Sequence, residues 1–253
     1  MHRIPAAWLA GCAAEPVSGM GGAATWRLRD ASGVVRYVKM ATERHAGDLR
    51  QEIARTRWLA ARGVRVPAVL DAADGGTTAA MLMEALPGVA PQACGRAAAG
   101  IVAAIARAFA ALHALPAGQC PFDETVAARL ARARADIRRG AVDPSQFDAR
   151  NSGQMPEQIH DRLAASVPRH EDLVVVHGDA TFDNILIDAN GEVGFIDCGR
   201  AGRADRYTDL ALLSAEIAEH FGSVRVKAFA RSYGLPRWDG DKAGFFRDLY
   251  ELF

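Results

Sequence analysis

Residues 174–199 read VVVHGDATFDNILIDANGEVGFIDCG, and this stretch decides the fold. Its two polar clusters, HGD at 177–179 and DCG at 197–199, each follow an apolar run typical of a short buried strand. Between the clusters, Asn190-Gly191 is the strongest short-range signal for a β-hairpin. We therefore expect a two-stranded ribbon that turns at residues 190–191 and carries polar groups at its strand ends.

The predicted ribbon brings three oxygen-bearing side chains together at its open end, away from the turn. With Asn190 and Gly191 as the two central turn residues, Asn184 lies opposite Asp197, and Asp179 lies on the loop that enters the ribbon. Amide and carboxylate oxygens suit a hard cation such as Mg²⁺, and a further carboxylate can orient a hydroxyl and accept its proton. Phosphoryl transfer uses that combination. Each residue taken singly is better explained as a turn cap, but three such residues at one end of the ribbon favour a catalytic site.

Length and charge limit the classes of partner. The 253 residues give room for one large domain or two smaller lobes. The 30 basic residues balance 30 acidic ones, so overall charge favours neither nucleic acid nor an anionic membrane as a partner. The most apolar stretch, 97–115, contains Arg107 and His113 and is predicted to be a core helix rather than a membrane span. We expect a small-molecule substrate and a monomer or weak dimer.

Cysteine usage indicates a reducing compartment. The chain has 4 cysteines, at positions 12, 94, 120 and 198, and none forms a CxxC pair. This spacing argues against a zinc knuckle or a disulfide framework. Leu9-Ala10-Gly11-Cys12 looks like a lipoprotein cleavage box, but the preceding segment is short and is interrupted by Pro5. We expect a cytoplasmic protein.

Strand patterns come first along the chain and helical patterns follow. The sequence predicts a hairpin at 23–29 and 34–40, a helix at 48–62 and strands at 66–70 and 79–84, and then helices at 96–115, 122–139, 154–165, 207–221, 223–232 and 241–252. The change occurs at Leu86-Pro87-Gly88, which can serve as a linker. We therefore expect an α+β chain in two lobes, 1–84 and 85–253, with a hinge about 84–88.

The order and spacing of the polar groups resemble a known family. HGD, four residues, Asn184, twelve residues and then D-x-G is similar to the catalytic core of kinase-fold small-molecule phosphotransferases. FIDCGRAGRADRYTDLALL resembles the aminoglycoside phosphotransferases, especially the 3′-hydroxyl class, and EIARTRWLAARGV, LHALPAGQCPF and the terminal YELF extend the similarity. The resemblance implies a two-lobed protein-kinase-like fold, with a small β-rich nucleotide-binding lobe and a larger, mainly helical catalytic lobe. It also implies ATP-dependent phosphorylation of an aminoglycoside hydroxyl, which gives antibiotic resistance.

The resemblance implies roles for the matching residues. Asp179 would be the catalytic aspartate, and Asn184 and Asp197 would hold Mg²⁺. Lys39 would contact the phosphates of ATP, with Glu52 as its ion-pair partner. Taken alone, Lys39 is better explained as a solvated strand end, but a long side chain aimed at phosphates needs a carboxylate to fix it.

Backbone contacts to the nucleotide are implied at two places. Gly21 and Gly22, in the glycine-rich run 19–22, would cover the phosphates with backbone N–H groups, although a flexible loop explains the run equally well. At the hinge, the backbone of Met83, Ala85 and Leu86 would read the adenine edge.

The implied acceptor pocket departs from the family pattern. An aminoglycoside carries several ammonium groups, so its pocket should present carboxylates and carbonyls. The matching residues are Asp148, Arg200, Glu219, Glu251 and the terminal carboxylate of Phe253. However, Gln146, Ala149, Arg150, His220 and Tyr250 stand where acidic residues are common. Each lost charged hydrogen bond weakens recognition of a polycation by about 1–3 kcal/mol, which puts the usual drug spectrum in doubt.

Two neighbouring polar residues are expected to be structural, and two other functions stay open. His177 would hold the catalytic loop by hydrogen bonds, and Asp209 would brace that loop from the next helix. The runner-up function is a kinase-fold phosphotransferase for another small hydroxylated metabolite, which the depleted acidic loop favours. A non-catalytic kinase-like nucleotide-binding module would lack the lysine, the catalytic aspartate or a metal ligand, and all are present.

Overall fold

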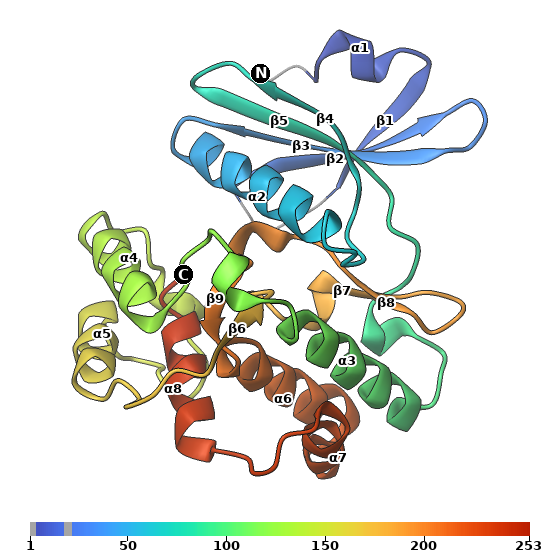
Figure 1. The fold of residues 1–253 in the computed structure, drawn as a ribbon. Helices are drawn as coiled ribbons and strands as arrows, with labels where there is room; N and C mark the ends of the chain where they lie inside the picture. Colours follow the sequence, from blue (N-terminus) through green and yellow to red (C-terminus); the bar gives the residue numbers. More distant parts are fainter. Residues whose placement is uncertain (1–3, 18–21) are drawn as a thin grey trace. The chain divides into compact units, whose positions relative to one another are not determined.

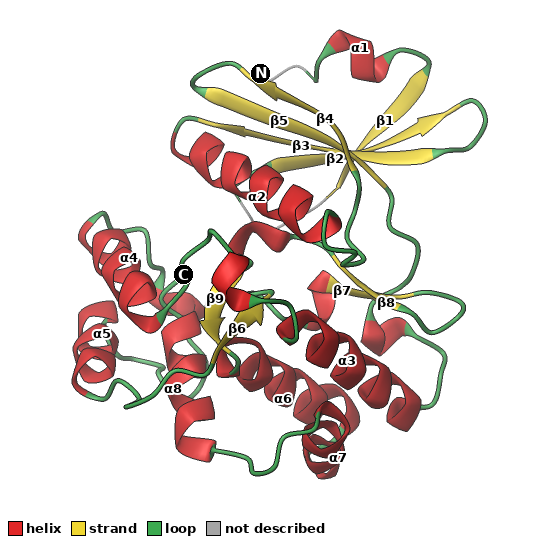
Figure 2. Cartoon of the chain, in the orientation of Figure 1, coloured by secondary structure: helices red, strands yellow, loops and turns green. Residues whose placement is uncertain are grey.

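The computed structural model describes residues 4–17 and 22–253, and its architecture is α+β, as the sequence predicts (Figures 1 and 2). The chain forms two compact units. The first contains the chain up to Val89 together with Leu186–Arg200, and the second contains Ala90–Ile185 and Ala201–Phe253. The ribbon segment 186–200 thus groups with the N-terminal part of the chain, where its turn Cys198–Arg200 contacts the helix at Arg44–Ala60, although the sequence places it in the C-terminal lobe. The functional division into a nucleotide lobe and a catalytic lobe stays a prediction.

The first unit is built on a five-stranded antiparallel sheet with strand order β1-β2-β3-β5-β4 (Figure 1). Its elements are α1 (Ala6–Leu9), β1 (Cys12–Val17), β2 (Ala24–Asp30), β3 (Val35–Thr42), α2 (Arg44–Ala60), β4 (Val69–Asp74) and β5 (Thr78–Glu84). Gly63, with φ 76°, follows α2 and supplies the left-handed residue that ends many helices.

Side chains alternate across β3, and this alternation positions Lys39. Val38 and Met40 are buried in a cluster with Leu28 on one face of the sheet. Ala41 is buried on the other face, in the cluster that includes Leu49 of α2. Because successive residues of a strand point to opposite faces, Lys39 shares the α2 face.

A β-hairpin, β7 (Ile185–Ile187) and β8 (Val193–Phe195), occupies the predicted ribbon. Its turn differs from the prediction. Asp188 N donates to Glu192 O over 3.0 Å and Gly191 N donates to Asp188 O over 3.0 Å, so the loop has three residues, 189–191. Gly191 has φ 86°, and Asn190 does not share the positive φ that a two-residue Asn-Gly turn requires at both positions.

The side chain of Asp188 explains this turn. Its Oδ1 accepts from the backbone N of both Asn190 and Glu192, each over 2.9 Å, which stabilises the longer loop. The longer loop shifts the predicted pairing by one residue. The ladder is also short, so Asn184 and Asp197 both lie beyond the paired residues rather than opposite each other within it.

The second unit is mainly helical (Figure 2). Its elements are α3 (Ala98–His113), α4 (Val126–Arg138), α5 (Pro156–Ala165), β6 (Leu173–Val176), β9 (Gly202–Asp205), α6 (Tyr207–Phe221), α7 (Val224–Tyr233) and α8 (Gly240–Tyr250), with short 3₁₀ turns η1 (Pro91–Ala93), η2 (Ala117–Gln119), η3 (Pro144–Gln146) and η4 (Phe182–Asn184). Helix α7 packs on α3 and α6, and α8 packs on α6 (Figure 1). None of the helices in residues 4–17 and 22–253 is long and apolar enough to span a membrane.

Candidate active site

Lys39, Glu52 and Asp197 meet in the first unit. The Nζ of Lys39 donates to Oε1 of Glu52 and to Oδ1 of Asp197, each over 2.6 Å. Three separate elements supply the residues: β3, α2 and the segment after β8. The side chain of Lys39 is 11% exposed, that of Glu52 14% and that of Asp197 46%. One ammonium therefore joins a mostly buried carboxylate to a more exposed one.

The two carboxylates decide the charge of Lys39. Burial by itself lowers the pKa of a lysine, but the negative charges of Glu52 and Asp197 outweigh it and leave the pKa of Lys39 raised. The ammonium is therefore charged at neutral pH and cannot act as a base. Burial also raises the pKa of the neighbouring Cys198 thiol, which favours its protonated form.

Asp197 has an unusual backbone conformation. Its φ is 57°, which places a residue with a side chain in the left-handed region. Aspartate tolerates this region better than most residues, but the conformation still costs about 1–3 kcal/mol and is frequent at functional sites. The ion pair with Lys39 helps to hold Asp197 in this position.

The other residues predicted to contact the nucleotide are two glycines before β2 and three residues at or just after the end of β5. Gly21 lies outside the described residues, and Gly22 is exposed in a bend. A Cβ at Gly22 would lie 2.2 Å from Nδ1 of His45, so a larger residue here would require the imidazole of His45 to move. Met83 is buried in β5, whereas Ala85 and Leu86 are partly exposed just after it.

The loop after β6 fixes the backbone of Asp179 in the second unit. The carbonyl of Asp179 accepts from Nδ2 of Asn184 and from the backbone N of Thr181, each over 2.9 Å. Asn184 is the last residue of η4 and is 9% exposed. Because its amide donates through nitrogen, its oxygen is left as a candidate metal ligand.

A buried carboxylate braces the same loop from α6. Asp209 is fully buried, and it accepts from the backbone N of His177 over 2.7 Å and of Gly178 over 2.8 Å. Its Oδ2 also lies 3.0 Å from Nε2 of His113, whose Nδ1 is 2.7 Å from the hydroxyl of Tyr233. The prediction that Asp209 braces the loop after β6 is confirmed, and the catalytic role of that loop stays a prediction.

Replacing Asp209 with alanine is expected to lower the free energy of unfolding by about 2–3 kcal/mol, because two buried N–H groups lose their acceptor. Urea denaturation followed by circular dichroism measures this loss. Asp241→Ala, on the exposed start of α8, is the control and should change stability little. An unchanged midpoint for the Asp209 variant would contradict the bracing role.

The contact between Tyr250 and Asp179 is a feature that the sequence did not predict. The hydroxyl of Tyr250, at the end of α8, donates to Oδ1 of Asp179 over 2.6 Å. The two residues are 71 positions apart, and no local pattern links them. The only sequence signal was that Tyr250 stands where the resemblance implies an acid.

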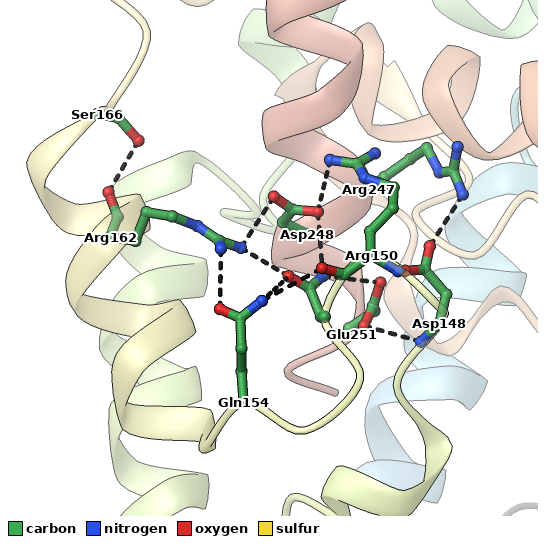
Figure 3. Close-up of polar contacts among 9 residues, drawn as sticks. Asp148, Arg150, Gln154, Arg162, Ser166, Arg247, Asp248 and Glu251 are labelled. Atoms are coloured by element: carbon green, nitrogen blue, oxygen red, sulfur yellow. Dashed lines mark hydrogen bonds and ion pairs between the residues drawn. The ribbon is translucent and has the colours of Figure 1, made fainter.

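A network of ion pairs joins α8 to the loop after η3 (Figure 3). Arg247 forms an ion pair with Asp148 over 2.9 Å. Asp248 forms ion pairs with Arg150 over 2.9 Å and with Arg162 over 3.0 Å. The predicted substrate residue Asp148 is therefore already neutralised by the protein itself.

Glu251 lies in the same network without a cationic partner among the described residues. Its carboxylate accepts from Nδ2 of the buried Asn151 over 3.1 Å and from the backbone N of Asp148 over 3.2 Å (Figure 3). Burial raises the pKa of Glu251, and these hydrogen bonds oppose the rise. The network thus joins the predicted pocket residues Asp148 and Glu251.

The remaining predicted pocket residues are Glu219, Phe253 and Arg200. Glu219 is exposed near the end of α6, and its neighbour His220 stacks on Phe182 with ring centroids 5.3 Å apart. The ring of Phe253 lies 4.9 Å from the guanidinium of Arg129. Arg200 belongs to the first unit, where it ends the short turn Cys198–Arg200.

The donor set fits Mg²⁺ in its chemistry. Residues 4–17 and 22–253 contain no group of three or more His, Cys, Asp or Glu side chains placed to hold a metal ion. Asn184 and Asp197 offer one amide oxygen and one carboxylate, and Mg²⁺ commonly takes few protein ligands besides phosphate and water. They belong to different compact units, and their meeting at one ion stays a prediction.

Comparison with known proteins extends over nearly the whole chain. The model of the phosphotransferase enzyme family matches residues 13–246. An aminoglycoside 3′-phosphotransferase from Streptomyces fradiae is 36% identical over 231 residues, which cover 86% of this chain and 85% of that protein.

Solved structures agree with this match. An aminoglycoside 3′-phosphotransferase of type VIII gives a TM-score of 0.88 at 35% identity and covers 96% of this chain and 94% of its own. The phosphotransferase APH(3″)-Id from Streptomyces rimosus, solved with ADP and streptomycin, gives 0.83 at 32% identity, with 94% and 92% covered. The predicted kinase-like fold is thereby confirmed. The chain belongs to the phosphotransferase enzyme family and, within it, to the aminoglycoside phosphotransferases.

Proposed function

We propose that the protein transfers the γ-phosphoryl group of ATP to a hydroxyl group of an aminoglycoside, with the 3′-hydroxyl as the first candidate. The observation that carries this proposal is the hydrogen-bonded set of Lys39, Glu52 and Asp197, each contact 2.6 Å long. A lysine held charged between two carboxylates suits contact with phosphates. Nucleotide use is supported by the ADP found in the Streptomyces rimosus relative.

The first unit supplies the groups that would bind the nucleotide. Lys39 would neutralise phosphate oxygens and Glu52 would hold its side chain. The backbone of Gly21 and Gly22 would cover the phosphates, and the backbone of Met83, Ala85 and Leu86 would meet the adenine. When bound, Mg²⁺ at Asn184 and Asp197 would neutralise charge on the phosphates.

The second unit supplies the group that would act on the acceptor. Asp179 would accept a hydrogen bond from the acceptor hydroxyl and orient it toward the γ-phosphorus. As the new P–O bond forms and the bond to ADP breaks, the hydroxyl proton would pass to the carboxylate of Asp179. Covalent chemistry at the protein is not required, which fits direct transfer.

Glu251 is the acid best suited to an ammonium group of the acceptor. Unlike Asp148, it has no cationic partner among the described residues. The acceptor would compete with Arg247 for Asp148. The other proposed contacts to the acceptor are Glu219, Arg200 and Phe253. This self-neutralised pocket favours acceptors that need few carboxylates.

Replacing Arg247 with glutamine should release Asp148 for the acceptor. The ion pair between Arg247 and Asp148 is partly exposed and contributes little free energy, so removing it should improve acceptor binding only modestly. We therefore expect the KM for kanamycin to fall by about two- to fivefold. Steady-state kinetics at low ionic strength measures the change. Arg231→Gln, on the exposed side of α7, is the matched control and should leave KM unaltered. A higher KM for the Arg247 variant would show that Arg247 binds the acceptor instead.

The 3″-hydroxyl of streptomycin is the second candidate acceptor. It is favoured by the 0.83 TM-score and 32% identity to the Streptomyces rimosus enzyme that was solved with streptomycin. An assay with kanamycin, neomycin and streptomycin, with mass analysis and NMR of the product, distinguishes the two positions. Transfer to none of them, together with transfer to another hydroxylated metabolite, would support the runner-up function.

Localisation in the cytoplasm is part of the proposal. All four cysteines, Cys12, Cys94, Cys120 and Cys198, are free thiols, as expected for a reducing compartment that also contains ATP.

A further inference from the structure

The hydrogen bond between Tyr250 and Asp179 joins two segments that are 71 positions apart in the sequence. Its O···O distance of 2.6 Å lies in the range of charge-assisted hydrogen bonds from a hydroxyl to a carboxylate. Both residues belong to the second compact unit. The phenol therefore contacts the carboxylate to which the proposed function gives the acceptor hydroxyl.

The backbone of Asp179 is fixed without Tyr250. Asn184 and Thr181 both donate to its carbonyl, and its own backbone N lies 3.3 Å from Nδ1 of His177. What these bonds do not determine is the rotation of the carboxylate about its side-chain torsions. A carboxylate that rotates freely would present its oxygens in many directions, most of them unsuited to the acceptor.

Tyr250 is itself held in place before any acceptor binds. The preceding Leu249 is fully buried and anchors the end of α8 in the core. The following Glu251 is tied to Asn151 and to the backbone of Asp148. A tyrosine has two side-chain torsions to the hydroxyl, so little entropy is lost when its ring is fixed.

We propose that Tyr250 is a positioning residue for the phosphotransferase reaction. Its hydroxyl holds Oδ1 of Asp179, and this leaves Oδ2 to receive the acceptor hydroxyl. The role rests on the proposed function, because it requires Asp179 to bind the acceptor. An acidic residue at position 250 would place a second negative charge beside Asp179, whereas the phenol provides a neutral donor.

The test is Tyr250→Phe, which removes one oxygen and keeps the ring. We expect kcat for aminoglycoside phosphorylation to fall about tenfold, with KM for ATP and for the acceptor within about twofold. Water is small and needs less orientation than a sugar hydroxyl. The ratio of ATP hydrolysis without acceptor to phosphoryl transfer should therefore rise.

Tyr207→Phe is the matched control. Its hydroxyl accepts from the backbone N of Asp239 over 2.8 Å, so its loss should lower the melting temperature without changing that ratio. A kcat within twofold of wild type for Tyr250→Phe, or an equal loss of hydrolysis and transfer, would overturn the positioning role alone. A wild-type enzyme that phosphorylates no aminoglycoside would instead refute the proposed function, and this role with it.

Discussion

Asp179→Asn is expected to lower kcat for aminoglycoside phosphorylation by about 10³-fold. The amide has the shape of the carboxylate, but it has no charge and cannot accept the proton that leaves the acceptor hydroxyl. Binding of ATP should be unchanged, because the residues proposed to contact the nucleotide itself lie in the first unit, and the proposed metal ligand Asn184 bonds to the backbone carbonyl of Asp179, which the substitution keeps. Stopped-flow or coupled steady-state assays measure kcat, and the thermal shift caused by magnesium and ATP measures binding.

Asp183→Asn, four residues further along the same loop, is the matched control for this substitution. Asp183 is exposed and accepts from Nε2 of Gln92 over 3.1 Å, so its variant should keep kcat within about twofold. A similar loss in both variants would indicate that general damage to the loop, rather than the chemistry of Asp179, limits the rate. Retained turnover in Asp179→Asn would refute its assigned role.

Lys39→Met is expected to lower kcat/KM for ATP by about 10²–10³-fold. The variant removes the charge proposed to contact the phosphates, and it also leaves the carboxylates of Glu52 and Asp197 facing a neutral side chain. Asp197 would then lose the partner that helps to hold its left-handed backbone. The loss should therefore appear in both kcat and KM for ATP rather than in the KM for the acceptor.

Lys227→Met provides the control, because Lys227 is an exposed lysine on α7. It should bind and turn over ATP as the wild type does. The raised pKa of Lys39 adds a pH criterion, because the ammonium is stabilised in the folded protein and is lost only as pH rises above the usual lysine range. If the dependence of kcat/KM for ATP on pH showed that Lys39 loses its proton near neutral pH, the assignment would be contradicted.

Linear motifs predicted a large part of the fold and of the site. The spacing of Asp179, Asn184 and Asp197 indicated a phosphotransferase, and the family match agrees with that activity, whereas the meeting of the three residues at one site stays a prediction. Helix α6 begins and ends where the apolar periodicity predicts. The pair of Lys39 and Glu52 came only from the resemblance, and the 2.6 Å contact now supports it.

Tertiary context explains what the sequence did not predict. Strand β1 (Cys12–Val17) is mostly exposed and contains Pro16, so it has no alternating apolar pattern and forms only by pairing with β2. Strand β9 (Gly202–Asp205) likewise pairs with β6 without strand-forming residues. The predicted two-residue hairpin turn was wrong because the side chain of Asp188 stabilises a three-residue loop.

Side-chain pairs between distant segments were equally beyond prediction. Arg247 and Asp148 are 99 positions apart, and no local pattern shows that one neutralises the other. The sequence shows that acids are depleted around Asp148, but no local pattern in it reveals that Asp148 is paired with Arg247.

The central claim, direct transfer from ATP to an acceptor oriented by Asp179, is tested most directly by the stereochemistry at phosphorus. ATP made chiral at its γ-phosphorus with oxygen isotopes is used to phosphorylate the aminoglycoside, and the configuration of the product is determined by ³¹P NMR. A single in-line transfer predicts inversion of configuration. Retention would mean two successive transfers through a phosphorylated enzyme, and it would contradict the account.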